Sequence, residues 1–213
     1  MCNRKDKFGK GLDNMSPQDM RDRLIESTIT VIANEGLDKT TTKAIASVTG
    51  INEAYIYRHF SHKEDLLAKA FEKLDIELAS FLLQHITEIF DYTMIDRVTR
   101  YRKYFDKLWG LFMDNREYCL AFIRYYYSPY FSKYSIEAHR QRYAPFIEKF
   151  SSAFKEGADV WMILNHILNV MLDFAVKVHC GQMSEEDDYT EHIFRVVYCS
   201  VEQYFKENSE SEC

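Results

Sequence analysis

The chain has 213 residues, of which 46% are hydrophobic and 28% are charged, an ordinary composition for a folded globular protein. It contains only seven Gly and three Pro, too few for the many tight turns of a β-sandwich or a barrel, so long helices are favoured. The net charge of -6, taken alone, argues against a protein that binds nucleic acid.

The charge is distributed unevenly along the chain. Residues 1–63 hold ten Lys or Arg against eight Asp or Glu, a balance of +2, whereas residues 64–213 hold 17 against 25, a balance of -8. A positive N-terminal part on an acidic body is expected when only the N-terminal part contacts phosphate.

The sequence predicts a cytoplasmic protein that does not enter a membrane. The first eleven residues carry positive charge without the apolar core of a signal peptide. The most apolar segment, residues 160–178, is interrupted by polar side chains and is not expected to span a membrane. These interruptions are Asn165, His166, Asn169, Asp173 and Lys177.

Five scattered cysteines without any Cys-x-x-Cys spacing are typical of reduced thiols in a cytosol. Cys119, Cys180 and Cys199 are predicted to be small core residues, and Cys2 and Cys213 to lie in the tails.

A first helix is predicted over residues 17–35. Ser16 is a suitable N-cap, Pro17 suits the first helical position, and Asp19 lies three residues after the cap, where the helix dipole favours an acid. Apolar residues then follow a helical period, and Gly36 can end the helix.

Two short helices are predicted next, on either side of a glycine turn. The run Thr40-Thr41-Thr42 caps the first, which continues to about Val48, and the second runs from near Glu53 to about Phe60. Gly50 separates them, so the pair is predicted to form a helix-turn-helix. Its small core would consist of Ile45, Ala46, Ile51 and Ile56.

The continuous segment GLDKTTTKAIASVTGINEAYIYRHFSHKEDLLAKAF, residues 36–71, resembles the DNA-binding domain of the TetR/AcrR family. The resemblance rests on Gly36-Leu37, the Thr cap before Ile45-Ala46, Gly50-Ile51-Asn52, Tyr57-Arg58-His59-Phe60 and Lys63-Glu64-Asp65-Leu66-Leu67. Two residues depart from the family pattern. Ala44 replaces a common acidic residue, which weakens a capping box, and the bulky Tyr55 alters what the recognition helix can read.

Helical periodicity continues to the end of the chain and predicts an all-α fold of about nine helices without strands. The remaining helices are expected at residues 62–90, 95–113, 116–127, 136–155 with a kink at Pro145, 158–180 and 186–206. The expected organisation is a flexible arm (1–15), a helix-turn-helix DNA-binding domain (16–63), a helical ligand-binding and dimerisation domain (64–207) and a flexible tail (208–213).

The resemblance implies which residues bind double-stranded DNA. Thr42, Tyr57, His59 and Lys63 stand where the family places phosphate contacts, and each carries a hydrogen-bond donor. The base-facing positions at the start of the two short helices are Lys43, Glu53, Ala54 and Tyr55, whose side chains include a donor, an acceptor and apolar groups that can meet base edges. Thr41 completes the predicted DNA-binding set. The alternative is that these are ordinary polar surface residues.

Aromatic residues are concentrated between residues 101 and 161, and most must belong to the core of a helical bundle. A small apolar or aromatic effector is expected to bind among them. The predicted ligand-binding residues are Trp109, Phe122, Tyr126, Trp161 and Asn165. Asn165, Asn169 and Asp173 share one helix face, which either binds the ligand or lies at the edge of a subunit contact.

No catalytic or metal site is predicted. His179-Cys180 and His192 with Cys199 lack the tight four-ligand spacing of a zinc site, and no nucleophile–base motif or phosphate loop is present. No catalytic residue and no cofactor are therefore expected, although a helical enzyme or a metal- or thiol-sensing module is the alternative of another class.

The resemblance implies a regulator that binds a palindromic operator as a homodimer, since a dimer places two recognition helices in successive major grooves. The dimer is expected to form through residues 158–206, and an effector would change the spacing of the two DNA-binding domains. A repressor is expected. The alternatives are an activator or a regulator without a small-molecule effector.

Overall fold

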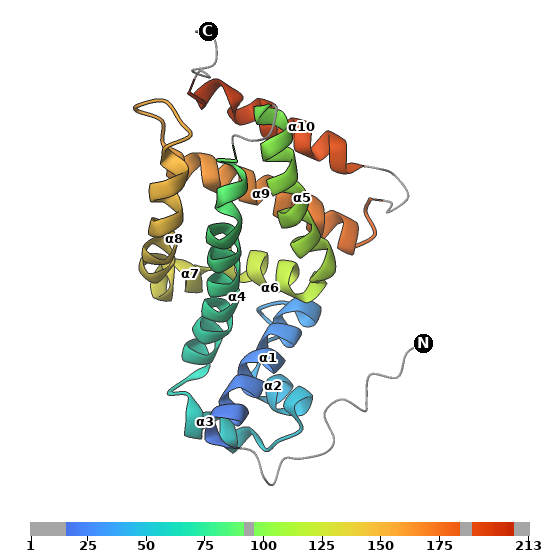
Figure 1. Ribbon diagram of the computed structural model, residues 1–213. Coiled ribbons are helices and arrows are strands. Elements are labelled where there is room, and N and C mark those ends of the chain that lie inside the picture. The colour runs from blue at the N-terminus through green and yellow to red at the C-terminus, as the bar shows by residue number, and fades with distance from the viewer. Residues whose placement is uncertain (1–15, 92–95, 184–188, 207–213) are drawn as a thin grey trace, which may run out of the picture. The chain divides into compact units, whose positions relative to one another are not determined.

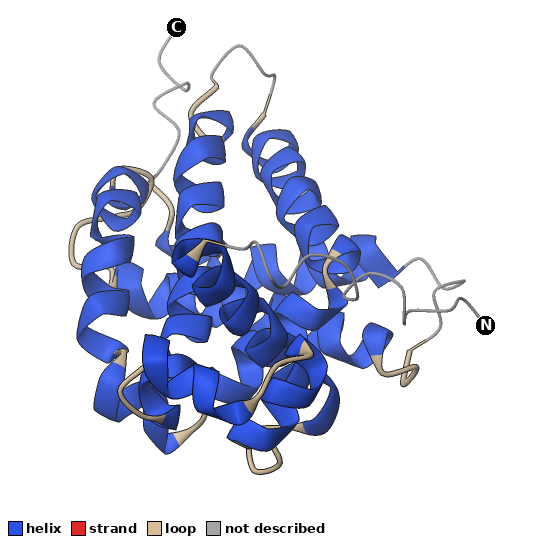
Figure 2. Cartoon of the chain, turned by 90° about the horizontal axis from the view of Figure 1, so that it is seen from below, coloured by secondary structure: helices blue, strands red, loops and turns tan. Residues whose placement is uncertain are grey.

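The computed structural model describes residues 16–91, 96–183 and 189–206, which form ten α-helices and three 3₁₀ segments (Figure 1). These described ranges contain no β-strand, only an isolated bridge between Phe154 and Phe205 (Figure 2). The predicted all-α fold is therefore confirmed. The helix absent from the prediction is the short α7 (Pro129–Tyr134), which begins at a proline as many helices do.

The chain divides into two compact units. The first comprises the described residues up to Ile76 together with Glu117–His139, and the second comprises Glu77–Arg116 and the described residues from Arg140. This division differs from the boundary expected after residue 63, because α4 (Lys63–His85) and α8 (Ile136–Ser151) each contribute to both units. The arm and tail predicted at the two ends lie outside the described residues.

The first unit contains the predicted helix-turn-helix. Besides the first parts of α4 and α8 and the short α7, its elements are α1 (Pro17–Glu35), α2 (Thr42–Thr49), η3 (Glu53–Tyr55), α3 (Ile56–His59) and α6 (Arg116–Tyr126). Helix α1 begins at the expected N-cap Ser16, and Asp19 completes a capping box: the Ser16 hydroxyl accepts from the Asp19 amide at 3.1 Å, and the Asp19 carboxylate accepts from the Ser16 amide at 3.3 Å. The cap satisfies amides that a helix start leaves unpaired.

Helix α6 joins the first unit through polar contacts with α1. The Arg124 guanidinium donates to the carbonyls of Ile32 and Ala33 at 2.6 and 2.9 Å, and the Thr30 hydroxyl donates to the Glu117 carboxylate at 2.9 Å. The last carbonyls of a helix need such partners, and the last turn of α1 has no basic residue of its own. Arg124 therefore caps α1 from a distant part of the chain.

The second unit is a helical bundle with a strongly aromatic core. Besides the later parts of α4 and α8, its elements are η4 (Ile86–Glu88), α5 (Arg97–Asp114), α9 (Val160–His179), α10 (Tyr189–Val201) and η5 (Glu202–Tyr204). Helix α5 packs against α9 and α10. Pro145 lies inside α8.

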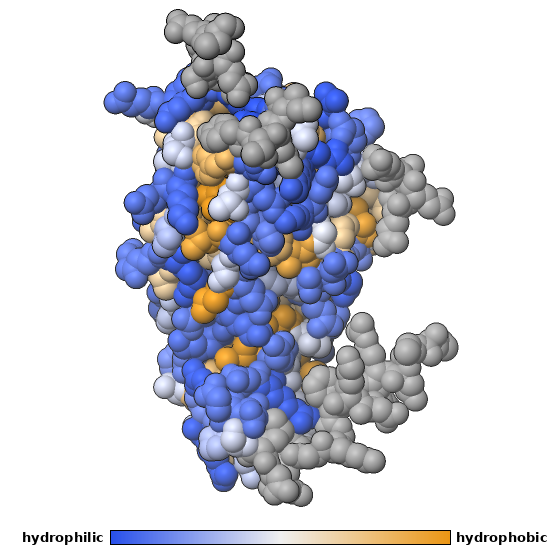
Figure 3. All heavy atoms as spheres, viewed as in Figure 1, coloured by the Kyte–Doolittle hydropathy of each residue, from blue (hydrophilic) through white to orange (hydrophobic). Residues whose placement is uncertain are grey.

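On the face drawn in Figure 3, hydrophilic residues predominate, and separate apolar patches interrupt them.

Helix α9 departs from the expectation that no segment could span a membrane. It is long and apolar enough to do so by length and composition, with a mean hydropathy of 1.3, and 39% of that window is buried. It also carries an ion pair between Asp173 and Lys177, at 2.6 Å, and charged groups are costly inside a bilayer.

Two of the three cysteines predicted to lie in the core do not. Cys119 is buried, but Cys180 and Cys199 are exposed. Cys180 follows the last residue of α9, and Cys199 lies on α10. Burial raises the pKa of the Cys119 thiol to about 12, so this cysteine holds its proton and behaves as a small apolar residue. Cys2 and Cys213 lie outside the described residues.

Candidate functional site

The helix-turn-helix is built by local capping interactions. The Thr41 hydroxyl accepts from the Ala44 amide at 3.1 Å and so begins α2, although Ala44 has no carboxylate to complete a capping box. Gly50 ends α2 in the left-handed conformation, with φ 79°, which favours glycine. The Asn52 amide oxygen then accepts from the Ala54 amide at 2.9 Å and begins η3.

Apolar contacts fix the two short helices in place. Ile45 and Ile56 are completely buried and Ala46 is nearly so, whereas Ile51 is half-buried. The Arg23 guanidinium donates to the Thr49 carbonyl and the Arg21 guanidinium to the His59 carbonyl, both at 2.9 Å. These bonds connect α1 to the C-terminal ends of α2 and α3.

The residues predicted to bind DNA differ in how exposed they are. Thr41, Lys43, Ala54, Tyr55 and Tyr57 are exposed, whereas Thr42, Glu53, His59 and Lys63 are half-buried. All nine lie in the segment from the N-cap of α2 to the first residue of α4.

Thr42 and Glu53 contact each other. The Thr42 hydroxyl donates to the Glu53 carboxylate, which uses the only proton that this hydroxyl can donate. Thr41, in contrast, accepts a bond as the N-cap and keeps its hydroxyl proton for another acceptor. The first turn of α2 therefore offers the Thr41 hydroxyl, rather than that of Thr42, as a donor toward phosphate.

Arg58 is a further candidate, absent from the predicted set. It is exposed, and its guanidinium carbon lies 4.4 Å from the centre of the Tyr55 ring. A cation over an aromatic face restricts both side chains. The three-residue spacing of Tyr55 and Arg58 on one helical turn is the sequence signal that could have revealed this pair.

The structure separates the five predicted ligand-binding residues. Phe122 and Tyr126 belong to the first unit, where their rings stack at 5.9 Å. Trp109, Trp161 and Asn165 belong to the second. There Trp109 stacks on Phe105 at 6.1 Å, and Asn165 donates to the Trp161 carbonyl at 2.9 Å.

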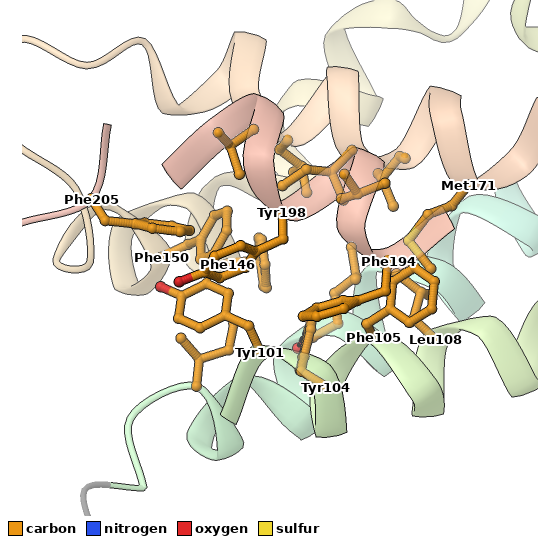
Figure 4. A pocket seen from close by; sticks show the side chains of 17 residues that line it. Tyr101, Tyr104, Phe105, Leu108, Phe146, Phe150, Met171, Phe194, Tyr198 and Phe205 are labelled. Atoms are coloured by element: carbon orange, nitrogen blue, oxygen red, sulfur yellow. Dashed lines mark hydrogen bonds between the residues drawn. The ribbon is translucent and has the colours of Figure 1, made fainter. Parts of the chain in front are cut away.

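A small apolar cavity of about 50 Å³ lies inside the second unit. Figure 4 shows rings from α5, α8 and α10 around it, with Met171 of α9. The Tyr101 and Tyr198 rings lie near Phe205, at 4.6 and 5.7 Å, at one end of this cavity. None of the five predicted ligand-binding residues lines it. Helical periodicity alone does not distinguish residues that line a pocket from residues that pack helices together.

A buried acid–base pair lies in the first unit, and the sequence did not reveal it. The Asp75 carboxylate is 2.7 Å from the His139 Nδ1 atom, and the two residues are 0% and 4% exposed. The His139 ring lies 5.3 Å from the Phe131 ring and 5.7 Å from the Tyr126 ring. Burial, with the nearby Tyr127 and Asp75, raises the pKa of Tyr126.

The described part of the chain contains no group of three or more His, Cys, Asp or Glu side chains that could hold a metal ion. His179, one of the residues considered for metal binding, bonds to the Phe112 carbonyl through its Nε2 atom at 2.9 Å.

Comparison with known proteins identifies the N-terminal region. Residues 24–70 match the sequence profile of the family described as bacterial regulatory proteins, tetR family. The chain is also 32% identical over 66 residues to the biofilm operon icaADBC HTH-type negative transcriptional regulator IcaR of Staphylococcus epidermidis. That match spans 31% of this chain and 36% of the relative, about a third of its length.

Solved structures share the fold over most of the chain. A TetR family transcription regulator from Marinobacter aquaeolei aligns with a TM-score of 0.69 at 16% identity, over 86% of this chain and 95% of that one. A TetR family protein from Vibrio parahaemolyticus aligns with a TM-score of 0.61 at 18% identity, over 89% of this chain and 100% of that one. Residues 24–70 therefore match the sequence profile of the tetR family of bacterial regulatory proteins, and the described chain has the fold of solved TetR family proteins.

Proposed function

We propose that this protein is a cytoplasmic transcriptional repressor that binds a palindromic DNA operator through α2, η3, α3 and the start of α4. The observation that carries the proposal is the family match over residues 24–70, in a segment whose donors Thr41, Lys43 and Tyr57 are exposed. Repression is proposed because the curated relative is named a negative regulator.

Phosphate and base contacts have different roles in this proposal. Tyr57, His59 and Lys63 bind phosphate and set the position on the duplex. Lys43, Ala54 and Tyr55 meet base edges in the major groove, while the Arg58 guanidinium packs over the face of the Tyr55 ring. Glu53 accepts from Thr42 through one carboxylate oxygen, and its other oxygen can accept from a cytosine.

The Lys63→Ala variant tests the DNA interface. Loss of one phosphate contact is expected to weaken binding to all duplexes about equally and to lower the slope of log affinity against log salt by roughly one. Tyr55→Ala is the matched control, because it should change which sequences are preferred. Fluorescence anisotropy over a salt series, with operator and random duplexes, measures both effects. Unchanged affinity and slope for Lys63→Ala would remove this residue from the interface.

A homodimer through residues 158–206 is the second part of the proposal. The described part of this segment consists mainly of α9 and α10, and Met162 and Val196 on these helices are 55% and 54% exposed. These side chains and the incompletely buried apolar surface of α9 are apolar surface that a second copy could cover. The two recognition elements of a dimer would then read the two halves of a palindrome.

The third part of the proposal is a small apolar or aromatic effector that binds at the cavity of the second unit. The cavity is apolar, as ligand sites between helices are, but 50 Å³ is far below the roughly 300 Å³ of a typical ligand pocket. An effector must therefore displace lining side chains, and this displacement gives the bound and free states different packing. A ligand can shift the equilibrium between two conformations of a protein only if it interacts differently with each of them.

Filling the cavity tests the effector site. Val197→Phe adds a ring at a lining position and is expected to abolish the ligand-induced rise in melting temperature and the release of operator DNA. In the unmodified protein, the effector should lower the affinity for operator DNA about 5- to 150-fold. A thermal-shift screen of apolar and aromatic compounds measures the rise in melting temperature, and mobility-shift assays measure the release of operator DNA.

Trp161→Ala is the matched comparison for this test. Trp161 lies 6.0 Å from the Tyr143 ring and does not line the cavity, so this variant should keep the response. If Trp161→Ala loses the response and Val197→Phe keeps it, the effector binds at the residues expected from the sequence instead of at the cavity.

A further inference from the structure

A second, open groove of about 430 Å³ lies in the second unit between α4 and α5. It shares no lining residue with the apolar cavity described above, and its volume lies within the usual range for small-molecule sites. The groove is lined by Phe81, His85, Asp106, Lys107, Gly110, Leu111, Asp114 and Asn115.

Gly110 is an unfavourable residue for its position. It lies in the interior of α5, where glycine costs about 1 kcal/mol relative to alanine. A Cβ atom built on Gly110 would meet no atom within 4 Å, so packing among the described residues does not require glycine there. The bare backbone at Gly110 would let a molecule in the groove approach the helix closely.

The charges around the groove leave one acid uncompensated. The Asp106 carboxylate accepts from Arg102 at 2.7 Å, and Lys107 pairs with Glu88. Asp114 is exposed and has no recorded ion pair or hydrogen bond with any residue that the structure describes. The groove therefore has a net negative charge.

The end of α5 adds to this negative potential. Asp114 is the last residue of the helix, whose last turn contains no basic residue, and helix C-termini favour cations over anions. The Asn115 amide nitrogen donates to the Leu111 carbonyl at 2.8 Å, which leaves the amide oxygen of Asn115 as an acceptor. An acid at this end destabilises the free protein, and a bound cation would reverse that effect.

We propose that this groove binds a small organic cation, an amine or amidine attached to a flat apolar group. The cation would be held by Asp114 and the Asn115 oxygen, and the flat group would lie over Gly110. Phe81 and His85, whose rings are 4.6 Å apart, provide an aromatic wall for the ligand. The proposal rests on residues of the second unit alone and is independent of DNA binding.

The experiment uses benzamidine as the probe, with benzamide as its neutral isostere and benzoate as its anionic one. Ligand-observed NMR on the full chain should show benzamidine binding about twofold to fivefold more tightly than benzamide, the range for an exposed charge pair. Asp114→Asn should bring this ratio to about one, and the ratio should also fall as salt is added.

Variants at Gly110 separate binding in the groove from binding elsewhere. Gly110→Phe fills the groove and should abolish binding of both benzamidine and benzamide, whereas Gly110→Ala adds only a methyl group in open space and should raise the melting temperature, which shows that the helix tolerates a side chain. Asp173→Asn, at an exposed acid on α9, should leave the ratio unchanged. The proposal is overturned if benzoate binds as well as benzamidine, if Gly110→Phe leaves binding intact, or if benzamidine does not bind at millimolar concentration.

Discussion

Replacement of Asp75 by alanine is expected to lower the free energy of unfolding by about 1 to 3 kcal/mol, the usual cost of removing one partner of a buried hydrogen bond. Asp75 is fully buried, and its carboxylate is 2.7 Å from the His139 Nδ1 atom. Alanine would remove the carboxylate that His139 contacts among Phe71, Tyr126 and Phe131, and loss of a buried hydrogen bond is costly. Urea denaturation followed by circular dichroism measures the change.

An exposed pair provides the control. Asp173 and Lys177 lie 2.6 Å apart with side chains 54% and 41% exposed, so Asp173→Ala should cost less than about 1 kcal/mol. Asp75→Asn keeps a hydrogen-bond acceptor and should lose less stability than Asp75→Ala, which keeps the comparison possible if the alanine variant does not fold. Equal losses for Asp75→Ala and Asp173→Ala would show that the buried pair contributes no more than a surface pair.

The pair also has a structural consequence within the first unit. Asp75 lies on α4 and His139 on α8, so their contact joins two helices whose residues are 64 positions apart in sequence. The aromatic rings around it exclude water, which strengthens the interaction of the two groups. We therefore expect loss of the pair to loosen the packing of α8 on α4.

Disruption of the proposed dimer is expected to produce the second large effect. The double variant Met162→Glu, Val196→Glu places two charges on the exposed apolar surface of α9 and α10, where burial of an unpaired charge in an interface is strongly unfavourable. The mass measured by sedimentation at micromolar concentration should fall from about twice the chain mass of 25.3 kDa to the mass of a single chain. Operator affinity should fall by about a hundredfold or more, since linked binding of two half-sites contributes that much.

Val98→Glu is the matched control for this variant. Val98 is also an exposed apolar residue of the second unit, but it lies in the first turn of α5, where an added acid suits the helix dipole. This variant should remain dimeric and bind the operator normally. A double variant that sediments as a dimer would place the subunit contact outside α9 and α10, and an unmodified protein that sediments as a monomer would remove the dimer itself.

The sequence alone determined the helical class and the helix-turn-helix. The capping box of Ser16 and Asp19, the left-handed turn at Gly50 and the buried Ile45 and Ile56 were all predictable. Each depends on residues close together in the chain, because caps, turns and helical periodicity are set by neighbours within about four residues.

Only the tertiary structure decided which side chains meet across the chain. Arg124 caps α1 from about 90 residues away, Asp75 meets His139, and the Thr42 hydroxyl binds Glu53 instead of remaining available for phosphate. The cavity is lined by Tyr101, Tyr198 and other residues of the second unit, none of them among the five expected from the sequence. Aromatic residues at helical spacing have the same pattern whether they face a cavity or a packed core, since the pattern specifies a helix face but not what lies opposite it.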